Sequence, residues 1–144
     1  MGPLIGLDAN IFIYTLEAHV TYGPAAAQLL KAVANGMVKA TASELIYLEV
    51  LAGKNVKTAA QEGRASAFLA GLGIVYKGID RQLLIAAAKL RRDFRIKTPD
   101  AIHVASAMAV GATQFVTNDQ ELIKKAVKGI AILSLDEAIA AIKE

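Results

Sequence analysis

An apolar run from residue 4 to residue 13 contains a single charged side chain, that of Asp8. The first part of this run, Leu4 to Leu7, has no polar alternation, which predicts a strand buried on both faces, as in a parallel sheet covered by helices. An ionisable side chain is costly to bury unless its charge is compensated. We therefore expect Asp8 where the strand ends and a cavity begins, because ligands of open parallel sheets bind outside the carboxyl ends of the strands.

The rest of the chain alternates between strand and helix patterns. A single domain, residues 1–144, is expected at this length. The alternation favours an α/β fold, a three-layer α/β/α sandwich around a mostly parallel sheet. Further strands are predicted over 37–42, 74–76, 114–117 and 130–133, and helices over 25–34, 44–52 (with Ser43 as its N-cap), 57–72, 81–94, 98–110, 119–127 and 135–142.

Composition limits the kinds of site, the cellular location and the partners that are expected. The chain has no cysteine, so neither disulfides nor thiolate metal sites are expected. No segment is typical of a signal peptide, and no apolar run approaches the ~20 residues that span a bilayer. We expect a cytoplasmic protein with no membrane association. A net charge of +3 is compatible with a polyanionic partner.

Four acidic residues from distant segments are predicted to meet at one edge of the sheet. Asp8 and Asp119 each follow a strand. Asp100 opens a helix through Thr98-Pro99-Asp100, and the start of that helix lies at the same edge. Glu49 lies six residues beyond Ser43 in a helix whose neighbouring residues are apolar.

Four carboxylates at close range raise one another's pKa unless a counter-charge is present. Oxygen ligands without a cysteine or histidine cluster suit Mg²⁺ or Mn²⁺. Such an ion in a basic protein points to hydrolysis of phosphodiesters. Taken singly, Asp100 is also explained as a first-turn acid favoured by the helix dipole, and Asp119 as a helix cap.

Four segments carry a family resemblance: Leu7-Asp8-Ala9-Asn10, Ser43 to Glu49, Thr98 to Ala107, and Phe115-Val116-Thr117-Asn118-Asp119. In order and spacing they resemble the PIN-domain nucleases, and most of all the VapC-type ribonuclease toxins of toxin–antitoxin systems. The resemblance implies a five-stranded sheet in the order 3-2-1-4-5, an endoribonuclease that uses Mg²⁺ or Mn²⁺ to cut RNA, a homodimer and a small antitoxin partner. It assigns catalysis and metal binding to Asp8, Glu49, Asp100 and Asp119, with Thr117 and Asn10 in support.

Other residues leave alternatives open. His103, three residues after Asp100, is expected to be a hydrogen-bonded core histidine rather than a general base. A basic cluster before Asp100 is either a solvated helix end or an RNA-binding surface; with Lys89 it comprises Arg91, Arg92, Arg95 and Lys97. A metal-dependent phosphatase or phospho-acceptor module, or a non-catalytic partner-binding protein, are the alternative functions. A phosphatase would want a partner for its carboxylate nucleophile, either an Asp two residues after Asp8, where Asn10 stands, or a Lys after a late strand, and the sequence shows neither clearly.

Overall fold

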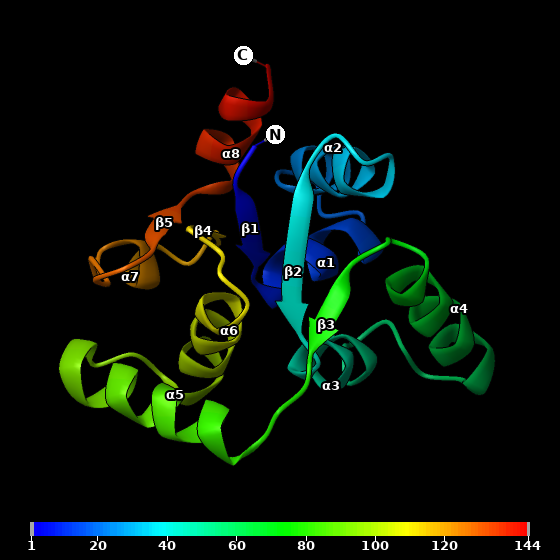
Figure 1. Cartoon of the computed structure of the whole chain (residues 1–144). Coiled ribbons are helices and arrows are strands. Elements are labelled where there is room, and N and C mark those ends of the chain that lie inside the picture. The colour runs from blue at the N-terminus through cyan, green and yellow to red at the C-terminus, as the bar shows by residue number, and fades with distance from the viewer. Residues whose placement is uncertain (1, 144) are drawn as a thin grey trace.

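The computed structural model describes residues 2–143. Strands and helices alternate along the chain, with paired helices after β1, β2 and β3 (Figure 1). The strands are β1 (Leu4–Leu7), β2 (Lys39–Ser43), β3 (Val75–Lys77), β4 (Gln114–Val116) and β5 (Ala131–Leu133). The helices are α1 (Ala9–Leu16), α2 (Gly23–Ala34), α3 (Leu45–Leu51), α4 (Ala59–Ala70), α5 (Arg81–Phe94), α6 (Thr98–Ala109), α7 (Gln120–Ile123) and α8 (Leu135–Lys143).

The five strands form one parallel sheet in the order β3-β2-β1-β4-β5. The expected three-layer α/β/α architecture and strand order are therefore confirmed. β1 is the central strand, and its neighbours come from distant parts of the chain: Ile5 aligns with Ala40 of β2 on one side and with Gln114 of β4 on the other. This topology gathers the carboxyl ends of β1, β2 and β4 at one edge.

Two apolar clusters fill the space on the two faces of the sheet. Ile5 and Leu7 belong to the cluster that α1, α2 and α8 cover, while Phe115 and Leu4 pack into the cluster beneath α5 and α6. α5 and α6 lie on the opposite side of the sheet from α1 and α2 (Figure 1). Alternation of side chains along β1 thus supplies both layers from one short strand.

Gly6 lets α6 approach the sheet closely. A Cβ atom at Gly6 would lie 2.5 Å from Cβ of Ala107 and 2.9 Å from Cδ1 of Phe115. Both distances are too short for real atoms, so only glycine fits at this position. The packing of α6 across β1 therefore depends on a residue without a side chain.

The structure corrects several predicted boundaries. After Asp8 the apolar run continues as the helix α1, which the sequence pattern did not predict. Ser43 ends β2 and is not the N-cap of α3, although its hydroxyl accepts a hydrogen bond from the Leu45 N–H over 3.1 Å. β2 begins at Lys39 rather than at residue 37, and the helix expected over 119–127 is a single turn, α7.

Across residues 2–143, every helix is too short or too polar to cross a membrane.

Candidate active site

Asp8 lies directly after β1, at the carboxyl edge of the central strand. Its side chain is only 5% exposed, and Oδ1 accepts a hydrogen bond from the Ala9 N–H over 2.8 Å. Asp8 is therefore the N-cap of α1, where a carboxylate is favoured by the free N–H groups of the first turn. Burial nevertheless raises the pKa of Asp8, although nearby His103 and the hydrogen bond from Thr117 oppose the shift.

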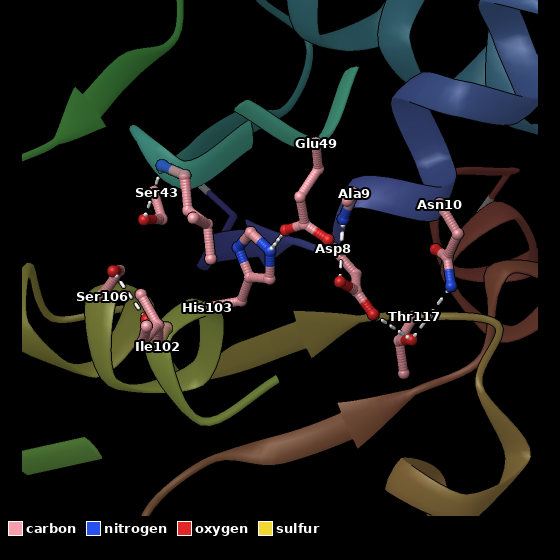
Figure 2. Close-up of polar contacts among 10 residues, drawn as sticks. Asp8, Ala9, Asn10, Ser43, Glu49, Ile102, His103, Ser106 and Thr117 are labelled. Atoms are coloured by element: carbon pink, nitrogen blue, oxygen red, sulfur yellow. Dashed lines mark hydrogen bonds and ion pairs between the residues drawn. The ribbon is translucent and has the colours of Figure 1, made fainter. Parts of the chain in front are cut away.

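Thr117, which follows β4, connects three parts of this edge through one hydroxyl group. Its Oγ1 lies 2.6 Å from Oδ2 of Asp8 and 3.4 Å from Nδ2 of Asn10 (Figure 2), and 3.1 Å from the backbone N of Asp119, which the figure leaves out. The last two groups are donors, so the single hydroxyl hydrogen goes to Asp8. Thr117 is fully buried, and it fixes the direction of the Asp8 carboxylate. The Oδ1 atom of Asn10 is buried without a partner among the described residues.

Glu49 and His103 form a second pair at the same edge. Glu49 projects from α3, and its Oε1 contacts Nε2 of His103 on α6. A carboxylate only accepts, so the ring carries its hydrogen on Nε2 and donates it to Glu49. Figure 2 shows the Glu49 carboxylate between the His103 ring and Asp8. The expectation of a hydrogen-bonded core histidine is confirmed, since His103 is 2% exposed.

Asp100 and Asp119 complete the acidic edge. Asp100 lies in the first turn of α6, after the predicted Thr98-Pro99 start, and Asp119 is the N-cap of α7, accepting the Glu121 N–H over 2.9 Å. The pKa of Asp100 is raised to about 6, first by burial and then by the charges of Asp8 and Asp119. The four predicted acids thus lie close enough to act on one another electrostatically, because Glu49 also raises the pKa of Asp100.

The acids are near one another but not gathered around a point. Among residues 2–143, no three carboxylate or imidazole groups stand at mutual distances that suit one metal ion. The donor set still fits a hard divalent cation: it consists of carboxylate oxygens, the Asp8 carboxylate is buried, and the other acids raise the pKa of Asp100.

The predicted basic cluster divides in two. Lys89 pairs with Asp93 over 2.9 Å, and Nε of Arg91 donates to the Ile96 carbonyl over 3.2 Å, so both have local partners. Arg92 is exposed on the same helix. Arg95 and Lys97, in contrast, line a small cavity that also contains Asp100 and Asp119.

Lys125 lines the same cavity and was missed by the sequence analysis. It follows α7, in a stretch where the sequence predicts an uninterrupted helix. Nothing in the pattern of charges separates Lys125 from its neighbour Lys124. Only the early end of α7 at Ile123 places the two lysines differently.

A comparison with family models shows to which family the chain belongs. Residues 5–128 match the family model of the PIN domain, which is most of the chain. The chain belongs to the PIN-domain family. The predicted family is therefore confirmed, and the four acidic segments that suggested it all fall inside the matched region of this PIN domain.

Solved structures share the PIN fold over nearly the whole chain. The chain resembles one in VapBC2 from Rickettsia felis bound to a promoter DNA fragment, with a TM-score of 0.66 and 17% identity over 91% of this chain and 98% of that one. A chain of DNA-bound VapBC from Salmonella typhimurium has a TM-score of 0.69 and 18% identity, over 94% of this chain and 99% of that one. A chain of a toxin–antitoxin complex from Klebsiella pneumoniae has a TM-score of 0.64 and 22% identity, over 90% of this chain and 96% of that one. No curated protein sequence matches the chain significantly.

Proposed function

We propose that this PIN domain is a metal-dependent endoribonuclease that hydrolyses RNA phosphodiesters, and that it is the cytoplasmic toxin of a toxin–antitoxin pair. The observation that carries the proposal is the convergence of four acids from separate segments at one edge of the sheet, where Asp8 is buried and the other three acids lie near enough to raise the pKa of Asp100. Such a concentration of carboxylates destabilises the empty site and favours a divalent cation. Family membership supports the same reading.

In this proposal Asp8, Glu49, Asp100 and Asp119 hold Mg²⁺ or Mn²⁺. When bound, the ion lowers the pKa of a water molecule and offsets the charge that develops on the phosphate. Thr117 keeps the Asp8 carboxylate turned toward the site by donating its only hydroxyl hydrogen. His103 holds Glu49 from the opposite side, and Asn10 fixes Thr117 through a weaker contact.

The hydrogen bond of Asn10 argues against a metal-dependent phosphatase. A phospho-acceptor carboxylate commonly acts with a second acid close by in the same loop, and Asn10 stands where that acid would be. The Asn10 amide contacts Thr117 instead. An amide cannot take up a proton as a carboxylate does, so this position lacks a general acid.

The toxin assignment rests on the structural neighbours, which are chains of complexes named VapBC or toxin–antitoxin. A small antitoxin protein is therefore the proposed partner, and a homodimer is the proposed assembly. Expression of this PIN domain in a bacterial host is expected to arrest growth, and co-expression of the gene adjacent to its own is expected to restore it. Growth unaffected by an active nuclease would contradict the toxin role while leaving the nuclease intact.

The nuclease itself is tested by cleavage of a mixed RNA pool with Mg²⁺, Mn²⁺ or EDTA. The parent protein is expected to cut only with metal, and Asp8→Asn and Asp100→Asn are expected not to cut. Asp136→Asn is the matched control, because Asp136 is an exposed acid in the first turn of α8, as Asp100 is in α6.

Calorimetric titration with Mn²⁺ separates the two ways in which the proposal would fail. A parent protein that binds Mn²⁺ but cuts no RNA would contradict the nuclease and leave the metal site. A parent that neither binds Mn²⁺ nor cuts would contradict both.

A further inference from the structure

A cavity of about 90 Å³ opens beside two of the acids. Its walls come from the segment between α5 and α6 and from α7 with the residues that follow it. The volume holds a phosphate group or a few waters but not a nucleotide. The lining residues are Arg95, Ile96, Lys97, Asp100, Asp119, Glu121, Leu122 and Lys125.

Three of these lining residues are cations without an acidic partner. Within the described chain, no ion pair involves Arg95, Lys97 or Lys125, although Asp100 and Asp119 line the same cavity. The other lining acid, Glu121, is exposed. Cations that share a cavity with acids, yet do not pair with them, are available to an anion that enters between them.

The position of Arg95 is unusual. It caps the end of α5 in the left-handed conformation, with φ 56° and ψ 42°, where glycine is the favoured residue. A side chain in this conformation costs about 1 kcal/mol. The turn directs the chain into Lys97, which is the N-cap residue of α6 and lies three positions before Asp100. A cation thus occupies a place that glycine would fill with less strain.

Neighbouring cations are excluded from the cavity. Arg92 and Lys124 are exposed and do not line it, although each lies within three residues of a cation that does. Lys128 is also exposed and lines a different, mostly apolar hollow. The three cations that line the cavity and the three that do not carry the same charge, so they differ only in position.

We propose that Arg95, Lys97 and Lys125 form a subsite for one backbone phosphate of the RNA strand, next to the phosphate that is cut. This inference rests on the proposed function. Carboxylates repel a phosphodiester, and three cations in the same cavity offset that repulsion. Arg95 offers a planar, two-pronged donor to phosphate oxygens, and the two lysines act as point charges.

The test compares two triple variants of equal charge. The cavity triple is Arg95→Gln, Lys97→Gln and Lys125→Gln, and the surface triple is Arg92→Gln, Lys124→Gln and Lys128→Gln. Each lowers the net charge of +3 by three. Binding of a fluorescently labelled single-stranded RNA of mixed sequence is measured by anisotropy in EDTA, over a series of salt concentrations, so that no cutting occurs.

The cavity triple is expected to weaken binding about tenfold and to reduce the slope of log K against log salt by about 0.7, the contribution of the one phosphate contact that is lost. The surface triple is expected to change the affinity and the slope much less, because it removes no phosphate contact. Equal losses in the two triples would overturn the subsite, since only overall charge would then matter. Absence of RNA binding by the parent protein would overturn it too.

Single variants keep the test decisive if the cavity triple does not fold. Lys125→Gln is then compared with Lys124→Gln, with thermal unfolding of both as the check. Metal-dependent cleavage by the parent is scored separately. A parent that cuts RNA while both triples bind alike overturns the subsite alone. A parent that does not cut, but whose binding depends on the cavity triple, retains the subsite and loses the nuclease.

Discussion

The Thr117 hydroxyl donates to Oδ2 of Asp8 over 2.6 Å, joining residues that lie 109 positions apart in the chain. Both side chains are buried, and two N–H donors already occupy the other side of the hydroxyl oxygen. The hydrogen bond therefore has one possible direction, and it stabilises the charged form of Asp8 against burial.

Thr117→Val is expected to lower the free energy of unfolding by about 1–3 kcal/mol, because the shape is kept while a buried carboxylate loses its donor. The measurement is urea unfolding in EDTA. Thr117→Ser is the control, since it keeps the hydroxyl and is expected to retain most of the stability. Equal losses in the two variants would show that the methyl group matters and the hydrogen bond does not.

The raised pKa of Asp100 makes stability depend on pH. Its value of about 6 in the folded protein exceeds the ordinary 3.8, so the folded state binds more protons between about pH 4 and pH 6. The free energy of unfolding therefore falls as pH rises through this window, and stays lower above it. Because the site is partly open to solvent, the loss is of the order of 1 kcal/mol.

Asp100→Asn is expected to remove the part of the pH dependence that comes from Asp100, to leave the part that comes from the raised pKa of Asp8, and to be more stable than the parent near pH 7. Urea unfolding in EDTA from pH 4 to pH 7 measures it, with the exposed Asp136→Asn as the control. A parent-like slope in Asp100→Asn would mean that the charges of the other acids do not reach this side chain.

His103→Phe keeps a buried ring but removes the Nε2–H that Glu49 accepts. Loss of such an outer partner of a metal ligand typically costs 10–100-fold in metal affinity, and we expect a loss of about that size for Mn²⁺ by calorimetry. At saturating Mn²⁺ the pH dependence of cleavage is expected to keep its shape, because in the proposed function His103 holds Glu49 and transfers no proton. His19→Phe, remote from the acids, is the control. A changed pH profile in His103→Phe would instead identify His103 as a proton carrier.

Gly6→Ala is expected to destabilise the fold by about 1–3 kcal/mol, because the added Cβ would overlap Ala107 and Phe115. Gly63→Ala is the opposite case: Gly63 lies inside α4 with nothing within 4 Å of an added Cβ. Alanine there is expected to stabilise by about 0.5–1 kcal/mol. Thermal or urea unfolding of the two variants measures both effects, and equal behaviour would contradict the close approach of α6 to β1.

The sheet and its acidic edge were predictable because each strand is a short apolar run and each acid follows one or opens a helix. The helix α1 was not, since Ile11, Phe12 and Ile13 suit a strand as well as a helix, and only the cap formed by Asp8 decides between them. α7 ends at Ile123, earlier than predicted, so Lys124 and Lys125 lie outside the helix. The contact of Glu49 with His103 depends on the packing of α3 near α6, a relation that sequence spacing does not encode.

The central place of β1 has a consequence for how the protein is made. β1 leaves the ribosome before the other four strands, but one of its two neighbours, β4, lies more than a hundred residues later. At ~5–20 residues per second, the wait for that neighbour is roughly 5–20 s. Throughout that time Asp8 lacks Thr117, and Asp119 does not yet exist. A chain interrupted before Asp119 therefore has no complete acidic edge, and whatever chemistry this edge performs begins only after Asp119 has been made.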